Sequence, residues 1–261
     1  MKYGFIGCGN MGGALIKALS KKTNDIMIAD FFMDKAESLA SELNLKAGTN
    51  KLVAENCDRI FLAVKPQMMD AVVSEMKDIL QAKKPTLITI AAGLKIEKIE
   101  AFAGGNLPVI RIMPNTPVSV GKGLIMYTSN ALAENILDDF VSDMAFAGTM
   151  DKLDEKLIDA GTALSGCGPA YMYMFIEALA DGGVACGLPR DKAMLYAKKT
   201  MEGAATLALS SNKHPGQLKD EVCSPGGSTI MGVKALEDGN LRASAVNAVI
   251  KAYEKNKELG K

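Results

Sequence analysis

The sequence is poor in several residue types on which whole classes of protein depend. Its 261 residues include no tryptophan, one histidine and only 5% aromatic side chains. The 30 basic residues balance the 30 acidic ones, so no long-range field attracts nucleic acid or an anionic membrane surface, and we expect neither as a partner. The single histidine, His214, excludes metal sites built from several histidines, and we expect no bound metal. We expect His214 to cap a helix or to lie at the surface.

Cysteine is also scarce, and its spacing forms no recognisable pattern. The five cysteines contain no C-x-x-C pair: Cys8, Cys57, Cys167, Cys186 and Cys223. An odd number of widely spaced cysteines argues against a disulfide framework or a zinc knuckle and favours a reducing cytoplasm. Cys167 has no cation or histidine beside it in the sequence to activate a thiol, so we expect a packed side chain there.

No apolar run is suited to crossing a membrane. Residues 160–176 carry no charge, but Gly166-Cys167-Gly168-Pro169 would break a spanning helix. We therefore expect a buried helix that begins near Pro169. At the amino end, Met1-Lys2 leads directly into an apolar strand, so we expect no signal peptide.

In the first part of the chain, short apolar runs alternate with amphipathic helical stretches. The expected strands are 2–7, 26–30, 59–64, 86–91, 109–113 and 124–127, and the expected helices are 11–21, 34–43, 68–80 and 132–146. This alternation predicts an α/β fold of the Rossmann type, in which helices cover both faces of a doubly wound parallel sheet.

The strand pattern stops near residue 151. Helices are expected at 154–164, 169–186, 189–210, 215–222, 228–237 and from 241 onward. We therefore predict a sheet domain over 1–151 and an all-helical domain over 152–261. The helix at 169–186 is apolar over most of its circumference and needs cover on all sides. A second copy of the chain would supply this cover, so we predict a homodimer with interlocked helical domains, or a larger homo-oligomer built from such dimers.

A G-x-G-x-x-G motif follows the first expected strand and opens the first helix. Its residues are Gly7, Cys8, Gly9, Asn10, Met11 and Gly12. The glycines allow a tight turn, close approach to a pyrophosphate and close helix packing, while the helix start offers free N–H groups to phosphate oxygens. In this context the motif predicts that residues 1–151 bind a dinucleotide. The alternative is a glycine turn without a ligand.

The second expected strand ends in an acidic residue, Asp30. A carboxylate in this position hydrogen-bonds the adenosine ribose hydroxyls and repels a 2′-phosphate, and Phe31-Phe32-Met33 offers no arginine to bind one. The residues themselves therefore favour NADH over NADPH. A simple exposed aspartate at a strand end is the alternative.

Small and rigid residues follow three later strands. These loops are Lys65-Pro66-Gln67, Ala91-Ala92-Gly93 and Pro114-Asn115-Thr116-Pro117. Ligands of doubly wound sheets bind at the carboxyl ends of the strands, so we expect the nicotinamide ribose to lie over these loops. Each loop by itself has a common composition, and only their succession favours a ligand.

The segment Ser224-Pro225-Gly226-Gly227-Ser228-Thr229 precedes an expected helix. Bare N–H groups of Gly226 and Gly227 at a helix N-terminus suit a carboxylate, and Thr229 can place its hydroxyl against an imine nitrogen. Reduction of a carbonyl needs a positioned proton donor, whereas reduction of a protonated imine does not, which agrees with the scarcity of histidine. The alternative is an ordinary helix cap formed by Ser224 or Ser228.

The whole chain resembles the pyrroline-5-carboxylate reductases, which catalyse the last step of proline biosynthesis. The similar stretches are Phe5 to Gly12, Ala63 to Pro66, Ile90 to Gly93, Met113 to Pro117, Leu164 to Tyr171, His214 to Asp220 and Ser224 to Thr229. The resemblance implies a Rossmann domain with a helical dimerisation domain, hydride transfer from NAD(P)H to 1-pyrroline-5-carboxylate to give L-proline, and an active site at the dimer interface.

The resemblance also implies roles for particular residues. The backbone of Gly226, Gly227 and Ser228 would hold the substrate carboxylate, and Thr229 would contact the ring nitrogen. Cofactor contacts would fall on Ile6, Gly7, Cys8, Gly9, Asn10, Met11, Asn50, Ala63, Val64, Lys65, Pro66, Ala91, Ala92 and Gly93. The glycine motif and the third loop add Gly12 and Asn115 as expected cofactor residues, from the sequence pattern itself. Members of the family that prefer NADPH commonly have Ser, Thr, Asn or Arg near the position of Asp30, so the family suggests NADPH while Asp30 suggests NADH.

Two other functions have a similar layout. The β-hydroxyacid dehydrogenases need a lysine on the helix after the glycine-rich turn near 166, and 169–186 contains none. A non-catalytic dinucleotide sensor would bind NAD(P) through residues 7–30 and signal through its helical surface. The six-membered homologue of the substrate stays open, because one ring methylene is worth only about 1–3 kcal/mol in a pocket.

Overall fold

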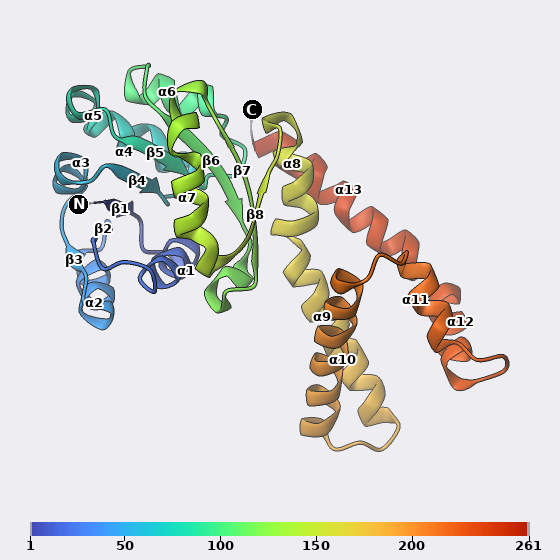
Figure 1. Ribbon diagram of the computed structural model, residues 1–261. Coiled ribbons are helices and arrows are strands. Elements are labelled where there is room, and N and C mark those ends of the chain that lie inside the picture. Colours follow the sequence, from blue (N-terminus) through green and yellow to red (C-terminus); the bar gives the residue numbers. More distant parts are fainter. Residues whose placement is uncertain (1, 260–261) are drawn as a thin grey trace. The chain divides into compact units, whose positions relative to one another are not determined.

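The computed structural model describes residues 2–259, which form two compact units (Figure 1). One unit contains the chain up to Cys167 together with the end of the last helix from Ala252, and the other contains Gly168–Lys251. The last strand ends at Lys152, beside the boundary predicted from periodicity, whereas the contacts divide the chain after Cys167. The difference arises because the residues that follow the last strand still pack against the sheet.

The first unit is built on an eight-stranded sheet with the order β3-β2-β1-β4-β5-β6-β7-β8. The strands are β1 (Tyr3–Ile6), β2 (Ile26–Ala29), β3 (Lys46–Ala47), β4 (Arg59–Leu62), β5 (Thr86–Thr89), β6 (Val109–Pro114), β7 (Gly123–Ser129) and β8 (Gly148–Lys152). All neighbouring strands are parallel except β6 and β7. The predicted doubly wound parallel sheet is confirmed, and β7 departs from it by pairing antiparallel to β6. The link between β6 and β7 is one short 3-10 turn at Thr116–Val120, and a parallel pair needs a longer crossover.

Helices cover both faces of this sheet. The helices α1 (Asn10–Leu19), α2 (Met33–Leu43) and α7 (Leu137–Met144) pack on one face. The other face is covered by α3 (Asn50–Asn56), α4 (Met69–Glu75), α5 (Lys77–Lys83) and α6 (Ile96–Ala103). The helix expected at 68–80 is in fact two helices, because the backbone of Met76 leaves the helical region between α4 and α5.

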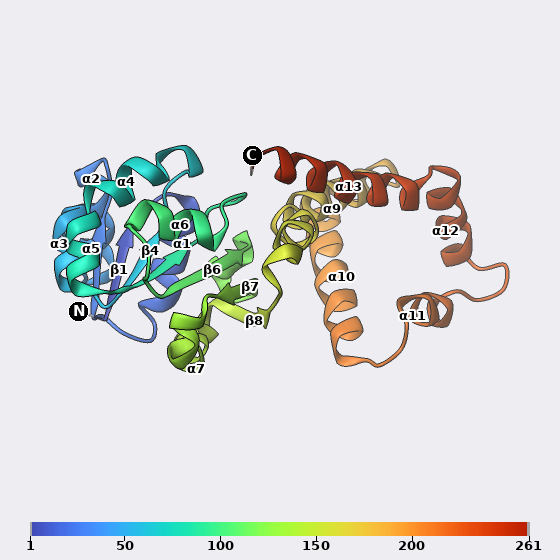
Figure 2. The same ribbon diagram turned by 90° about the horizontal axis from the view of Figure 1, so that it is seen from above.

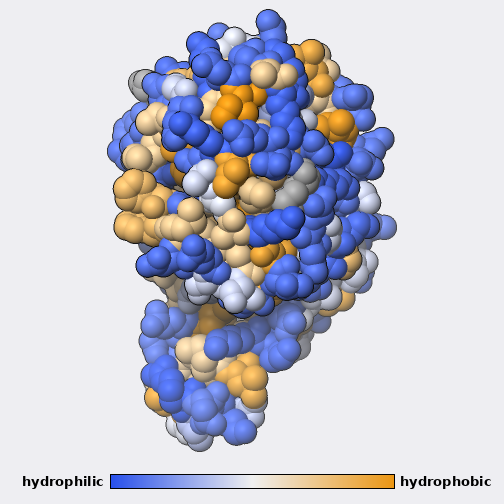
Figure 3. Space-filling model, turned by 90° about the vertical axis from the view of Figure 1, so that its left-hand side faces the viewer, coloured by the Kyte–Doolittle hydropathy of each residue, from blue (hydrophilic) through white to orange (hydrophobic). Residues whose placement is uncertain are grey.

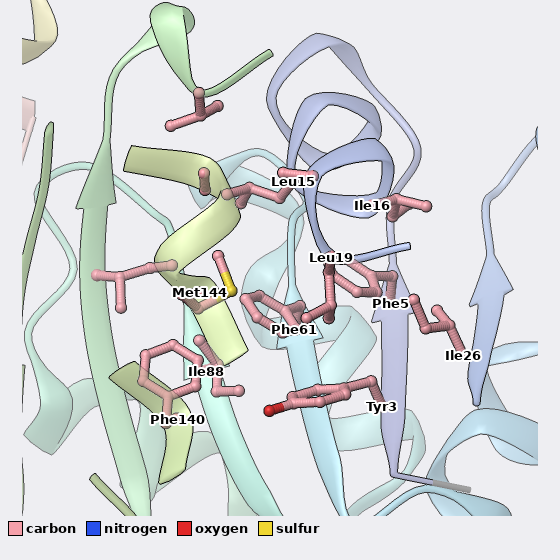
Figure 4. Close-up of a cluster of buried hydrophobic side chains, with 14 of the residues drawn as sticks. Tyr3, Phe5, Leu15, Ile16, Leu19, Ile26, Phe61, Ile88, Phe140 and Met144 are labelled. Carbon is pink, nitrogen blue, oxygen red and sulfur yellow. The ribbon is translucent and has the colours of Figure 1, made fainter. Parts of the chain in front are cut away.

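The core consists of apolar layers on the two faces of the sheet, and Figure 4 shows the layer beneath α1 and α7. Alternate residues of β1 enter alternate layers: Tyr3 and Phe5 lie in the layer with α1 and α7, and Ile6 lies in the layer with α3 to α6. Phe5 stacks on Phe61 of β4 with ring centroids 4.2 Å apart. Because both faces are buried, the central strands are mostly apolar rather than alternating, with Arg59, Thr86, Thr89 and Arg111 as the buried polar exceptions among them.

A buried polar cluster closes the amino end of the sheet. The Tyr3 hydroxyl donates to the Asp143 carboxylate of α7 at 2.6 Å and accepts from Arg59 at 2.8 Å, and Lys2 pairs with Asp143 at 2.6 Å. Burial raises the pKa of Asp143, but hydrogen bonds from Lys2 and Tyr3 outweigh burial and leave this pKa below its ordinary value. The cluster joins α7 to β1 and β4 by charge-assisted hydrogen bonds.

Five helices follow the last strand after a short linking segment. This segment contains α8 (Ile158–Gly161) and a π-helical turn at Thr162–Gly166. The helices are α9 (Gly168–Ala185), α10 (Arg190–Ser210), α11 (Pro215–Val222), α12 (Ser228–Asp238) and α13 (Leu241–Leu259). Within 2–259, no helix is both long and apolar enough to cross a membrane.

The helical unit buries little apolar surface by itself. Its buried contacts join α9 to α10 through Ala180, Ala193 and Ala197, while α11 and α12 lie apart from that pair (Figure 2). On α9, Tyr173 is 60% exposed and Met174 is 70% exposed. By contrast, the face of the sheet unit seen in Figure 3 is mainly hydrophilic, with apolar residues in small groups. The helical unit therefore lacks the cover that its apolar side chains require.

Candidate active site

The glycine-rich turn between β1 and α1 has two packed glycines and one open glycine. Gly7 has a φ of +106°, and a Cβ there would lie 2.5 Å from the Ala63 carbonyl oxygen. A Cβ on Gly12 would lie 2.3 Å from the Gly7 carbonyl oxygen. At Gly9, a Cβ would meet nothing within 4 Å. The backbone of Gly9 thus faces open space, as a pyrophosphate requires.

The first turn of α1 offers bare N–H groups beside this open space. Gly9 is the N-cap residue, and no side chain caps the helix. A hollow of about 620 Å³ adjoins the turn; its lining includes Cys8, Gly9, Asn10, Lys35 and Ser119. Two lysines, Lys17 and Lys35, line this hollow, and Lys17 is paired with Glu42. A helix N-terminus beside lysine side chains suits phosphate groups.

Asp30 lies directly beside the turn, and both of its carboxylate oxygens accept backbone hydrogen bonds. Oδ2 accepts from the Cys8 N–H at 2.6 Å, and Oδ1 accepts from the Phe32 N–H at 3.0 Å. The carboxylate is therefore held in place, and its remaining lone pairs are free to accept from ribose hydroxyls. Burial, together with the Asp30 charge, raises the pKa of the Cys8 thiol to about 11, so this cysteine stays a neutral packing residue.

The other predicted cofactor residues follow parallel strands whose carboxyl ends meet at the same edge. Ala63 follows β4, and Ala91 follows β5 with its N–H bonded to the Thr89 hydroxyl at 3.2 Å. Lys65 is exposed, and Asn50 begins α3 directly after its N-cap residue Thr49. The fold thus brings the residues predicted from separate loops to one edge of the sheet.

Asn115 lies at that edge, but its side chain is engaged within the protein. Its Oδ1 accepts from the Leu124 N–H at 3.0 Å, and its Nδ2 donates to the Ser165 carbonyl and hydroxyl oxygens, each at 3.2 Å. Ser165 lies fifty residues away in the chain. Local sequence gives no signal for this contact, which arises because β6 ends beside the π-helical turn.

The second predicted site, Ser224 to Thr229, forms the uncapped start of α12. Gly226 has a φ of +67°, Gly227 is the N-cap residue, and no side chain caps the helix. A Cβ on Gly227 would lie 2.3 Å from the Ser224 hydroxyl oxygen, so a side chain there would force that hydroxyl to move. The alternative in which Ser224 or Ser228 caps this helix is therefore wrong, and the first-turn N–H groups are available to a carboxylate.

His214 is the N-cap residue of α11, which is one of its two expected roles. Its ring Nδ1 accepts from the Gly216 N–H at 3.1 Å, and the backbone N–H of His214 donates to the Gln217 side-chain oxygen at 3.0 Å. Among residues 2–259, no group of three or more His, Cys, Asp or Glu side chains is arranged to hold a metal ion.

Comparison with known families accounts for both parts of the chain. Residues 155–259 match the family described as pyrroline-5-carboxylate reductase dimerisation, and residues 2–93 match NADP oxidoreductase coenzyme F420-dependent. The pyrroline-5-carboxylate reductase of Pisum sativum is 40% identical over 98% of this chain and 95% of its own length. The Escherichia coli enzyme of that name is 38% identical over 100% of this chain and 98% of its own length.

Solved structures agree with these matches. A Plasmodium falciparum pyrroline carboxylate reductase with NADP bound has a TM-score of 0.90 and 34% identity, and the match covers 100% of this chain and 98% of that one. A Coxiella burnetii pyrroline-5-carboxylate reductase gives the same four values. From its sequence and its fold over the full length, the chain belongs to the pyrroline-5-carboxylate reductase family.

Proposed function

We propose that this chain reduces 1-pyrroline-5-carboxylate to L-proline with a hydride from a reduced nicotinamide dinucleotide. The observation that carries the proposal is the uncapped start of α12, where Gly226 and Gly227 precede Thr229. A small anionic imine is the substrate that such a site suits, because it presents a carboxylate to bare N–H groups and a ring nitrogen to a hydroxyl.

The sheet edge is suited to the dinucleotide. The open backbone at Gly9 and the N–H groups of α1 would hold the diphosphate, and Asp30 would accept from the adenosine ribose. The remainder of the dinucleotide would lie against Ala63 to Pro66, Ala91 to Gly93 and Asn50. When bound, the reduced nicotinamide supplies the hydride. A fixed carboxylate at Asp30 repels a 2′-phosphate, so we propose that NADH is preferred over NADPH.

At α12, the protein's own groups bind and orient the imine. The Gly227 N–H donates to the Ser224 carbonyl at 3.1 Å, so the N–H groups of Gly226 and Ser228 would hold the carboxylate. The Thr229 hydroxyl hydrogen-bonds the ring nitrogen. The carbon receives the hydride, the C=N electron pair moves to the cationic nitrogen, and a neutral amine results. No alkoxide forms, so the site needs no histidine or lysine as a proton donor.

We propose that the active protein is a homodimer joined through the helical unit, or a larger assembly of such dimers. The support is the exposed apolar surface of α9 and the match of residues 155–259 to a dimerisation family. We also propose a cytoplasmic location, which suits five cysteines that are all free thiols.

Steady-state kinetics with the cyclic imine and each nicotinamide in turn tests this proposal. Loss of reduced-cofactor absorbance that depends on 1-pyrroline-5-carboxylate is the expected result, with L-proline as the product. A β-hydroxy acid with oxidised cofactor serves as the control reaction. Oxidation of the β-hydroxy acid without reduction of the imine would contradict the proposal. Cofactor binding without any turnover would indicate a sensor.

A further inference from the structure

The segment that leads into α9 contains an irregular turn. Residues Thr162–Gly166 are π-helical, and the Cys167 N–H donates to the Thr162 carbonyl at 3.0 Å. Pro169 stands four residues after Ser165 and carries no N–H. The Ser165 carbonyl therefore cannot receive the hydrogen bond that a regular α-helix would provide from that position.

Asn115 supplies the missing donor. Its Nδ2 lies 3.2 Å from the Ser165 carbonyl oxygen and 3.2 Å from the Ser165 hydroxyl. The opposite end of the same amide is fixed, because Oδ1 accepts from the Leu124 N–H at 3.0 Å. A single half-buried side chain thus connects the end of β6, the start of β7 and the π-helical turn.

We propose that Asn115 is a positioning residue for the hydride transfer, which it serves by holding the π-helical turn against the carboxyl edge of the sheet. The inference rests on the proposed function: the nicotinamide is held at that edge, and the imine is held by the helices that follow Gly168. The π-helical turn ends the main segment of the sheet unit at Cys167, so a shift of its backbone would disturb the edge at which the nicotinamide is held. Small errors in placement cost large factors in rate.

The chemistry at this position is specific to an amide. The substitution Asn115→Asp would remove the donor and place a carboxylate oxygen against the Ser165 carbonyl, whereas Asn115→Gln would add one methylene, too long for both contacts. This role differs from a direct contact with the dinucleotide, which is what the sequence predicts for Asn115. The two roles make opposite predictions for cofactor affinity.

A double-mutant cycle separates them. Asn115→Ala is expected to lower kcat at least tenfold while leaving the Kd for NADH within about twofold of the wild type, because the residue acts through Ser165. Pro169→Ala restores a backbone N–H four residues after Ser165. In the Asn115→Ala/Pro169→Ala protein, the loss of kcat caused by the alanine at 115 should be several-fold smaller than in the wild-type background.

Asn130→Ala is the matched control. Asn130 makes the same kind of contacts at the amino end of β6: its Oδ1 accepts from the Val109 N–H at 3.0 Å, and its Nδ2 donates to the Leu107 carbonyl at 2.7 Å. Its replacement should lower the urea midpoint of unfolding without lowering kcat of the remaining folded protein. An equal loss of kcat in Asn130→Ala would mean that general destabilisation explains the effect, which overturns the positioning role.

Two further outcomes overturn the inference. A tenfold or greater rise in the Kd for NADH in Asn115→Ala would make the residue a direct ligand. An undiminished loss of kcat in the Pro169→Ala background would show that the Ser165 carbonyl is not the relevant partner. Urea unfolding compares the wild type, Asn115→Ala, Pro169→Ala and the double variant. Asn115→Ala should lower the urea midpoint less in the Pro169→Ala background than in the wild-type background. If the substitutions at 115 and 169 are coupled in urea unfolding but the wild type does not reduce the imine, the proposed function is refuted and the hydrogen bond is still established.

Discussion

At the level of single residues, some of the proposed contacts are made by backbone N–H groups and others by side chains. In the proposed sites, backbone N–H groups hold the phosphate and the carboxylate, so the conformation of glycines such as Gly9 and Gly227 determines both sites. We propose that two side chains add specificity: Thr229 for the imine nitrogen and Asp30 for the ribose. This division makes the two side chains the informative positions to change.

Replacement of Thr229 should affect turnover rather than cofactor binding. We expect Thr229→Ala to lower the rate at saturating imine by about ten- to a thousandfold, because the hydrogen bond to the ring nitrogen orients the carbon for attack. Steady-state kinetics and NADH titration measure the two effects separately. Thr229→Ser keeps the hydroxyl and should retain most of the rate; an unchanged rate in the alanine variant would remove the proposed role.

Replacement of Asp30 should change the choice of cofactor. Asp30→Ser removes the charge that repels a 2′-phosphate, so the ratio of kcat/KM for NADH to that for NADPH should shift toward NADPH. Asp78→Asn is the control, because Asp78 is exposed in the first turn of α5 and does not line the hollow beside the glycine-rich turn. No shift in the ratio for Asp30→Ser would count against this assignment.

Among the elements, α7 depends on polar contacts as well as apolar packing. Asp143 pairs with Lys2 at 2.6 Å and with Arg59 at 3.4 Å, and its side chain is only 8% exposed. Asp143→Ala would leave Arg59 and the Tyr3 hydroxyl without this partner in a buried place. We expect a loss of about 3–5 kcal/mol in the free energy of unfolding, measured by urea denaturation.

The same cluster gives a pH dependence of known sign. The pKa of Asp143 is lower in the folded protein than its ordinary value, so its contribution to stability is complete above about pH 4 and is lost as pH falls further. The wild type should therefore lose more stability between about pH 5 and pH 2 than Asp143→Ala does. Equal acid sensitivity of the two proteins would contradict this assignment.

For the whole molecule, association should depend on the apolar surface of α9. Met174 is 70% exposed in the single chain, and Met174→Glu should weaken the dimer because a charge would be buried in the interface. Lys198→Glu, on the exposed part of α10, introduces the same residue as a control. Light scattering at micromolar concentration should detect a dimer or larger species for the wild type and the control; a wild-type monomer would exclude the proposed assembly.

Local signals in the sequence determine most of the elements and the glycine-rich turn. Apolar period and turn residues place β1, β2, β4, β5 and β6, and glycine spacing indicates the dinucleotide turn, because these features depend on neighbours within a few residues. The strands β3 and β8 were not predicted. Lys46–Ala47 and the exposed Gly148–Lys152 carry little apolar pattern, and they become strands only by pairing with β2 and β7.

Tertiary structure decided which distant groups meet. The direction of β7, the contact of Asn115 with Ser165 and the absence of a side-chain cap on α12 all depend on where the backbone goes after a turn. A one-dimensional pattern records which groups can form a hydrogen bond, but the partner is selected by chain packing in three dimensions. For this reason the sequence determined that Asn115 belongs to the sheet edge, and only the folded chain determined what its amide binds.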